Sequence, residues 1–362
     1  MFIKNAWYVA GWSSEIKGDT LLARKLLGER VVLYRGEDGK IAALEDRCPH
    51  RHAPLSCGQR EGNTVRCMYH GLVFDPAGKC VEIPGQDRIS EKMAVRSYPV
   101  VERDHLIWFW PGDPALADPA QIFSVESHQS ADWNVRLDGY IHYDSNCQLI
   151  ADNLLDFSHL AFVHNKSIGT SALANQRPAV EYLDNVVRIT HWTPGVPRPP
   201  FAGKISDLPE TIDRSLIYTW YVKGNLFEQT SVMSPVNTGG IDSKEPTAVK
   251  LRTLIALTPE TDTTSHYFWS TARNDFLTKV ERVTEALWEQ VSSAFTEDRE
   301  MIEAQQKVIS EDPAKPMLGI AADGALMRVR WMVDQLIAKE KGESAPRSVR
   351  AATSHQIEAV SG

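Results

Sequence analysis

Two short stretches decide the fold, CPHRH at residues 48–52 and CMYHG at residues 67–71. Each contains one cysteine followed closely by one histidine, so the candidate ligands are Cys48, His50, Cys67 and His70. Thiolate and imidazole together suit either zinc or an iron–sulfur cluster. A zinc site usually begins with two closely spaced cysteines, and a Cys-x-His loop leaves little room to wrap one tetrahedral ion. A two-metal cluster fits better, because each loop can send its cysteine to one metal and its histidine to the other.

The paired loops resemble those of a Rieske [2Fe–2S] centre, and this resemblance implies that the two cysteines and two histidines hold the cluster. Imidazoles in place of two thiolates raise the reduction potential to roughly −150 to +300 mV, which suits electron delivery to an iron that binds O2. A structural zinc protein is the alternative. We interpret His52 as a loop or supporting residue rather than a fifth ligand. Three cysteines without a histidine at comparable spacing are expected to be ordinary buried or partly buried thiols: Cys57, Cys80 and Cys147.

The composition is that of a folded globular protein. The 362 residues are 43% hydrophobic and 24% charged, which allows a large core and favours two domains. A net charge of −8 without any basic block argues against a nucleic-acid partner. The N-terminus lacks a signal-peptide pattern, and the longest apolar run, Leu106–Trp110, is far too short to span a bilayer. Five cysteines are unlike a secreted disulfide framework, so we expect a cytoplasmic protein without a membrane partner.

The order of sequence patterns predicts an α+β fold. Residues 30 to about 112 alternate short apolar runs with turns, which predicts an all-β domain, and a Pro- and Gly-rich linker follows. We expect a Rieske domain over residues 1–115. A helical signal from Leu149 to Val163, strands from about Val180 to Trp269 and helices from about Asp275 onward predict a mixed α+β iron-binding catalytic domain over 116–342. Its antiparallel sheet would be flanked by helices, and a mobile tail would occupy 343–362.

A second group of candidate ligands lies in the predicted catalytic domain. His159 and His164 are five residues apart, about 140° around an ideal helix, so both can face one metal only if the helix unwinds or ends between them. Asp298 lies on an apolar helical stripe, where a carboxylate is costly unless it is paired or bound to metal. The stripe consists of Leu287, Val291, Phe295 and Ile302. Two histidines and one carboxylate would form the facial triad of a mononuclear Fe(II) site. Glu297 is a weaker candidate, because it falls about 100° off the stripe.

These motifs resemble the iron-binding motifs of the vanillate and dicamba O-demethylase branch of the Rieske oxygenases. The matching patterns are Asn153-Leu154-x-Asp156-x-x-His159-x4-His164 and Phe295-x-Glu297-Asp298, and further matches extend over nearly the whole chain. The resemblance implies that Asp156 links the iron site to the Rieske site of a neighbouring subunit, and therefore that the protein is a homotrimer. If Asp156 lies on a helix with His159, its carboxylate can also reach the non-ligating nitrogen of that imidazole.

The resemblance implies a terminal oxygenase that activates O2 at Fe(II) and inserts an oxygen atom into a C–H bond of an aromatic substrate. Oxidative O-demethylation of a methoxylated aromatic acid, with release of formaldehyde, is the leading expectation. N-dealkylation, methyl hydroxylation and ring dihydroxylation stay open, and an electron-transfer protein without oxygenase activity is the competing class. Four residues are hypothesised to line the substrate pocket: Asn153, Gln229, Ile255 and Trp288.

The electrons must come from another protein. No Gly-x-Gly-x-x-Gly pattern that would indicate a flavin or nicotinamide site occurs in the sequence. We therefore expect a separate NAD(P)H-dependent reductase as a partner, acting directly or through a ferredoxin.

Overall fold

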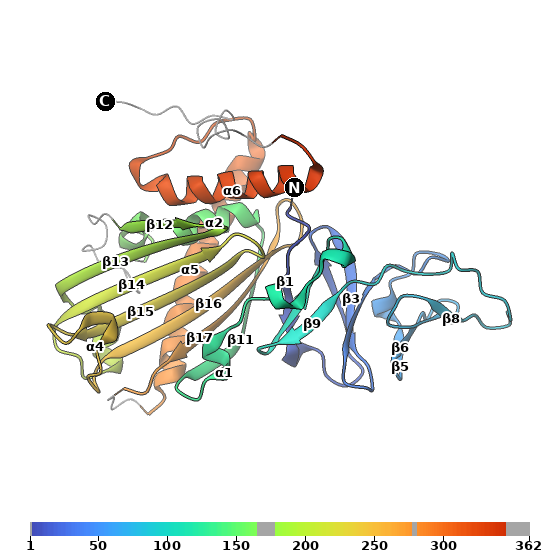
Figure 1. Cartoon of the computed structure of the whole chain (residues 1–362), viewed down its shortest axis with the longest axis horizontal. Helices are drawn as coiled ribbons and strands as arrows, with labels where there is room; N and C mark the ends of the chain where they lie inside the picture. Colours follow the sequence, from blue (N-terminus) through green and yellow to red (C-terminus); the bar gives the residue numbers. More distant parts are fainter. Residues whose placement is uncertain (1, 165–177, 277–280, 345–362) are drawn as a thin grey trace. The chain divides into compact units, whose positions relative to one another are not determined.

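The computed structural model describes residues 2–164, 178–276 and 281–344 (Figure 1). The chain divides into two compact units. The first contains Met1–Ser124 and the short segment Thr258–Asp262, and the second contains Val125–Leu257 and Thr263–Gly362. No helix in the described ranges is both long and apolar enough to cross a membrane.

The described part of the first unit is built from strands and short 3-10 helices, as the all-β prediction requires. Its strands form three antiparallel sheets, ordered β1-β10-β9, β2-β3-β4 and β5-β6-β7-β8. The strand bounds are β1 (Tyr8–Trp12), β2 (Leu21–Leu26), β3 (Glu29–Arg35), β4 (Ile41–Glu45), β5 (Gln59–Glu61), β6 (Thr64–Arg66), β7 (Val73–Phe74), β8 (Cys80–Glu82), β9 (Val100–Arg103) and β10 (Leu106–Phe109). The 3-10 helices are η1 (Ser13–Glu15), η2 (Leu55–Cys57), η3 (Pro114–Leu116) and η4 (Pro119–Gln121).

An apolar core that contains both cysteines joins two of these sheets, β2-β3-β4 and β5-β6-β7-β8. Tyr34, Leu44 and Phe74 are fully buried in one cluster with the cysteines Cys48 and Cys67. Burial of large apolar side chains is the main favourable term in folding, so the two cysteines are anchored in a stable core of this unit.

The second unit is centred on a seven-stranded antiparallel sheet in the order β11-β17-β16-β15-β14-β13-β12. Its strands are β11 (Asn134–Tyr143), β12 (Ala179–Leu183), β13 (Val186–Pro197), β14 (Thr211–Tyr221), β15 (Leu226–Pro235), β16 (Val249–Pro259) and β17 (Ser265–Arg273). The helices are α1 (Glu126–Gln129), α2 (Cys147–Leu155), α4 (Pro200–Ile205), α5 (Val283–Glu311) and α6 (Gly324–Lys341), with 3-10 helices η5 (Ser158–Ala161), η6 (Gly240–Asp242) and η7 (Ala321–Asp323). The α+β fold with an antiparallel sheet flanked by helices is therefore confirmed.

Helix α5 runs across one face of the sheet (Figure 1) and contacts β11, α2 and α4. The expected stripe lies on the buried side of the helix: Leu287, Phe295, Asp298 and Ile302 are all at most 9% exposed, and Val291 is partly buried. The helix begins at Val283, and residues 277–280 of the expected helix lie outside the described residues, as do residues 345–362 of the expected tail. The sheet and α5 together enclose the space in which a ligand can be held.

The helix expected from Leu149 to Val163 is shorter than predicted. α2 ends at Leu155, and Asp156 has an extended backbone with φ −99° and ψ 123°. The Asp156 carboxylate accepts a 2.7 Å hydrogen bond from the backbone N–H of Ser158. Such a local bond from an Asp side chain competes with the helical pattern, which explains why the helix stops there. The chain continues as the 3-10 helix η5, which contains His159.

Candidate cluster and metal sites

The two cysteine loops have the same backbone geometry. In each, the N–H four residues after the cysteine donates to the cysteine carbonyl, and the cysteine N–H donates to the carbonyl five residues ahead. The distances are 2.9 and 2.8 Å for His52→Cys48 and Cys48→Ala53, and 2.8 and 2.8 Å for Gly71→Cys67 and Cys67→Leu72. The fourth residue is left-handed in both loops, with φ 57° at His52 and 77° at Gly71. His52 thus takes the backbone role that Gly71 has in the other loop.

The four predicted cluster ligands lie in two pairs. The thiols of Cys48 and Cys67 are buried and contact each other, and burial, reinforced by Cys67, raises the pKa of Cys48 to about 11. The rings of His50 and His70 are exposed, and their centroids are 4.4 Å apart. Thiols on the inner side and imidazoles on the outer side form the donor set of a two-metal cluster in which one iron takes sulfur and the other takes nitrogen. The residues therefore fit a Rieske cluster.

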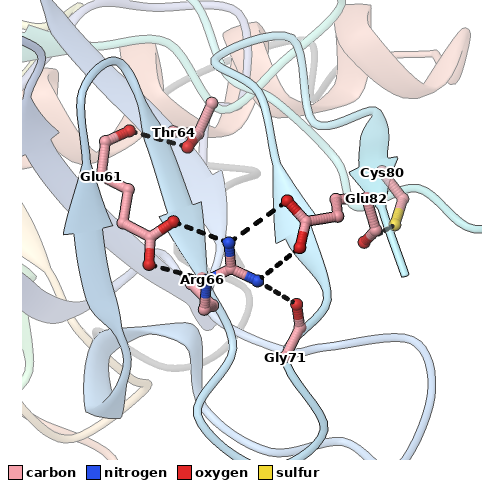
Figure 2. A network of polar contacts seen from close by, with 6 residues as sticks. All are labelled: Glu61, Thr64, Arg66, Gly71, Cys80 and Glu82. Carbon is pink, nitrogen blue, oxygen red and sulfur yellow. Dashed lines mark hydrogen bonds and ion pairs between the residues drawn. The ribbon is translucent and has the colours of Figure 1, made fainter. Parts of the chain in front are cut away.

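An arginine supports the second loop, and the sequence analysis did not identify it. Arg66 directly precedes Cys67 and donates to Glu61, Glu82 and the carbonyl of Gly71, at 2.7 to 3.2 Å (Figure 2). Two-point bonds between a guanidinium and carboxylates fix the orientation of both partners. Arg66 thus ties the end of the loop to the strands on either side of it.

A buried carboxylate supports the first loop. Asp46 is 5% exposed, and its two oxygens accept from the backbone N–H and the hydroxyl of Ser56, each at 2.7 Å. Because Asp46 lies two residues before Cys48, these bonds hold both ends of the first loop. Neither support has a recognisable sequence pattern, because Asp46 and Arg66 bond to partners as far as ten and sixteen positions away in the sequence.

The remaining cysteines follow the prediction in two cases. Cys80 and Cys147 are buried thiols, and burial raises the pKa of both, to about 12 for Cys147. Cys57 is exposed, which corrects the expectation of a buried or partly buried thiol. It ends the surface 3-10 helix η2, whose Leu55 fills the core, so Cys57 points to solvent.

In the second unit, the predicted iron ligands come together. Nε2 of His164 lies 3.1 Å and Nε2 of His159 lies 3.6 Å from the same oxygen, Oδ1 of Asp298. One donor atom from each residue lies within 4.8 Å of the others. The two histidines come from η5 and the chain after it, and Asp298 comes from α5. This set can hold one metal ion and leaves open positions for other ligands.

The buried carboxylate of Asp298 tests whether the site fits a metal ion. Asp298 is 5% exposed, and within the described ranges it lies within ion-pair distance only of the two histidines and not of a lysine or arginine. A carboxylate buried in this way is unfavourable unless it meets a cation. The amide of Asn153 donates to Oδ1 of Asp298 at 3.0 Å and helps to orient it. A divalent metal held by Asp298 and the two imidazoles would supply such a cation.

Asp156 faces His159, although not in the way the sequence suggested. It does not lie on a helix with His159, because the helix ends before it. Its Oδ2 is 3.9 Å from Nδ1 of His159, which is longer than a hydrogen bond. Nδ1 of His159 has no hydrogen-bond partner among the described residues. Burial, opposed by the nearby Asp298, lowers the pKa of His159. The Asp156 carboxylate therefore lies beside the free nitrogen of a candidate ligand without being bonded to it.

Glu297 has a role that the sequence analysis missed. It was considered only as a substitute ligand, but its Oε2 lies 2.8 Å from Nδ1 of His164. Burial lowers the pKa of His164, but contacts with Asp298 and Glu297 outweigh it and raise that pKa overall. A proton on Nδ1 that is held by Glu297 leaves Nε2 free for a metal. The 100° between the two carboxylates on α5 is what lets them reach opposite nitrogens of one imidazole.

A cavity lies against these donor atoms. It has a volume of about 100 Å³ and is enclosed by the sheet, α5 and the segment after α2. An apolar cavity of roughly 150 Å³ binds benzene, so this space is on the scale of a single ring. Asn153, Gln229 and Ile255 line it, as hypothesised.

Trp288 is not among the residues that line this cavity. It lies about 100° around α5 from Leu287, which does line it. Its ring stacks on Trp269 with the centroids 3.8 Å apart. The hypothesised pocket role of Trp288 is therefore corrected. Arg214 also lines the cavity, and the sequence analysis did not single it out.

Comparison with known proteins decides the family. Residues 143–339 match the vanillate O-demethylase oxygenase C-terminal domain, and residues 6–99 match the Rieske [2Fe–2S] domain. The chain belongs to the vanillate O-demethylase branch of the Rieske oxygenases. This Rieske oxygenase is a monooxygenase component with a [2Fe–2S] cluster and a mononuclear iron as its cofactors. These relatives are named as a subunit of a monooxygenase system, an oxygenase subunit and an oxygenase component, so they are parts of multi-component systems.

Several relatives match over nearly the full length. The iron–sulfur subunit TsaM1 of the toluene-4-sulfonate monooxygenase system from Comamonas testosteroni is 45% identical over 96% of this chain and 100% of its own. The vanillate O-demethylase oxygenase subunit from Pseudomonas sp. (strain HR199 / DSM 7063) is 35% identical over 94% and 96%. The crystal structure of dicamba monooxygenase bound to dicamba matches with a TM-score of 0.84 and 33% identity, covering 94% of this chain and 99% of that one.

Proposed function

We propose that this Rieske oxygenase hydroxylates a methyl carbon of a single aromatic ring that also carries an acidic group. The observation that carries the proposal is a cavity of one-ring scale directly against His159, His164 and Asp298. The relatives at 45% and 44% identity belong to a toluene-4-sulfonate monooxygenase and a putative one, which supports an arenesulfonate or a similar acid. The methyl C–H bond becomes C–OH with one atom of O2. The other oxygen atom leaves as water, with two electrons and two protons consumed.

The chain's own residues are assigned as follows in this proposal. Cys48, Cys67, His50 and His70 hold the cluster, and His159, His164 and Asp298 hold the iron. When bound, the cluster supplies single electrons and the iron supplies O2 activation. Glu297 keeps the proton of His164 on Nδ1, and Asn153 orients Asp298. Apolar side chains that line part of the cavity, among them Leu287, Val291 and Phe295, would limit the access of water to the reacting carbon.

Oxidative O-demethylation is the second candidate. The vanillate and dicamba O-demethylase relatives and the dicamba monooxygenase structure support it. Hydroxylation of a methoxy carbon gives a hemiacetal, which breaks down to a phenol and formaldehyde. The same site would thus perform the same C–H step on a methyl group attached through oxygen.

The test is turnover with an NAD(P)H-dependent reductase and three probes, 4-methylbenzenesulfonate, 4-methylbenzoate and 4-methoxybenzoate. We expect substrate-dependent O2 uptake with benzylic alcohol from the first two, whereas formaldehyde from the third would favour the second candidate. The control is His164→Ala, which should keep the cluster spectrum but lose product. NAD(P)H oxidation without any substrate-dependent O2 uptake would leave an electron-transfer protein instead.

We further propose a homotrimer in which electrons pass between subunits, with the reductase acting directly or through a ferredoxin. Support comes from the exposed edges of His50 and His70 and from the position of Asp156 beside His159. Light scattering should give three times the chain mass. Mixed oligomers of Cys67→Ser and His164→Ala chains, each inactive alone, should regain part of the activity, and no recovery in verified mixed oligomers would contradict transfer between subunits.

A further inference from the structure

One cation in the cavity, Arg214, has no counter-charge among the residues that the structure describes. Arg214 lies on β14 and lines the cavity together with Tyr218, which is four residues ahead on the same face of the strand. It is 7% exposed, and its guanidinium makes no hydrogen bond or ion pair with any described residue; Nε is buried without a partner. The undescribed internal stretches, residues 165–177 and 277–280, contain no Asp or Glu.

The nearest acid in sequence is already engaged. Asp213 points to the opposite face of β14, where its oxygens accept from the backbone N–H groups of Gly195 and Asn237, each at 3.0 Å. The other acids that line the cavity also have partners, Asp298 with the two histidines and Asp156 with the N–H of Ser158.

The titratable neighbours do not neutralise the guanidinium either. Burial, together with the charge of Arg214, lowers the pKa of His191 to about 4, so this imidazole is neutral at pH 7. Burial raises the pKa of Tyr218 to about 12, so the phenol is neutral as well. No described residue therefore compensates the charge of Arg214 in the absence of a ligand.

A buried, unpaired guanidinium is unfavourable for the fold by itself. Its planar group of N–H donors matches the paired oxygens of a carboxylate or sulfonate. Ser231 lines the same cavity and lies diagonally across from Arg214, because it pairs with Leu216 on the neighbouring strand. Its hydroxyl can take a remaining oxygen of such a group. An anion that enters the cavity would satisfy Arg214 at one end, while the metal donors lie along another wall.

We propose that Arg214 binds the acidic group of the substrate, a carboxylate or sulfonate on the aromatic ring, and so selects anionic arenes over neutral ones. This inference rests on the proposed function, since it assigns the specificity of the same cavity. It makes Arg214 the residue that fixes the ring by its charged end and presents the opposite end to the reacting centre.

The test compares two ligands of nearly the same shape, 4-methylbenzenesulfonate and the uncharged 4-methylbenzenesulfonamide, by anaerobic calorimetry on the holoenzyme. The wild type should bind the sulfonate more tightly. Arg214→Met should weaken sulfonate binding about 30-fold or more and leave the sulfonamide nearly unchanged. The sulfonate affinity of Arg214→Lys should lie between those of the wild type and Arg214→Met, because lysine keeps the charge but not the two-point geometry.

A matched control is available on the same sheet. Arg252 lies on β16 between the lining residues Leu251 and Thr253, so its side chain is on the opposite face, where it pairs with Glu126 at 2.7 Å. Arg252→Met should therefore leave both affinities unchanged. Without ligand, Arg214→Met should melt at the wild-type temperature or above it, because it removes an unpaired buried charge. If Arg214→Met fails to fold, the sulfonate affinity of Arg214→Lys is the test instead.

Sulfonate binding that is unchanged in Arg214→Met, or in Arg214→Lys where only that variant folds, would overturn the inference. Equal wild-type affinity for the two ligands would overturn it too. The proposed function is judged separately by product formation. If the wild type binds the sulfonate preferentially through Arg214 but never oxidises its methyl group, the proposed reaction is wrong and the proposed anion site stands. If the methyl group is oxidised equally well by the wild type and by Arg214→Met, the proposed reaction stands and the proposed anion site is wrong.

Discussion

The two candidate metal sites are built in opposite ways. Each cysteine loop contributes its two ligands within four residues, and the same two backbone hydrogen bonds shape both loops. The iron site joins His159 and His164 to Asp298, which follows more than 130 residues later on a different helix. Local turns fix the first site, whereas contacts of α5 with α2 and with the histidine segment after it fix the second. A site made of local turns is more readily specified by a short sequence pattern than one made by packing.

The sharpest way to test that difference is to remove one ligand from each site. Asp298→Ala should lose the mononuclear iron and keep the cluster absorbance. The iron content should then fall from about three to two per chain. Cys67→Ser should lose the cluster absorbance and its roughly two irons, and keep the other one. Both variants should lose turnover completely. Metal analysis with visible spectroscopy measures this, and loss of both metals in either variant would show that the sites do not form independently.

The same contrast explains how much the sequence could predict. The Rieske domain, the antiparallel sheet and the grouping of His159, His164 and Asp298 followed from spacing, apolar periodicity and family resemblance. The end of α2 at Leu155 did not, because one bond between Asp156 and Ser158 outweighs the helical pattern. Arg214 escaped notice because its importance depends on strand register and on the absence of a described counter-charge, and neither is visible in a single strand.

Substitution of Glu297 tests the iron site without removing a candidate ligand. Glu297→Gln keeps the size of the side chain but weakens the hold on Nδ1 of His164, and supporting residues of this kind contribute about 10- to 100-fold to metal affinity. We expect faster loss of iron to a chelator and recovery of turnover with excess Fe(II). Glu300→Gln, on the exposed side of the same helix, is the control. Iron retention equal to the wild type would mean that Glu297 does not position His164.

Gly71 tests the loop site. Its φ of 77° is unfavourable for other residues, and a Cβ there would lie 2.7 Å from Cγ of Pro84. Gly71→Ala should lower the free energy of unfolding of the first unit by about 1–2 kcal/mol. Thermal bleaching of the cluster should shift down, while iron retention in the second unit stays unchanged. An unchanged bleaching temperature would contradict the strain argument.

His52 gives the smallest expected effect, because it has the same left-handed conformation in the other loop, φ 57°, with a side chain already present. His52→Gly relieves strain of about 1 kcal/mol, loses backbone entropy of similar size and breaks an exposed contact of 3.0 Å with Arg47. The net change should stay within about 0.5 kcal/mol, and the cluster spectrum should not change. Loss of the cluster in His52→Gly, as in Cys67→Ser, would instead make His52 a ligand. The two loops would then no longer be equivalent, because Gly71 can ligate nothing.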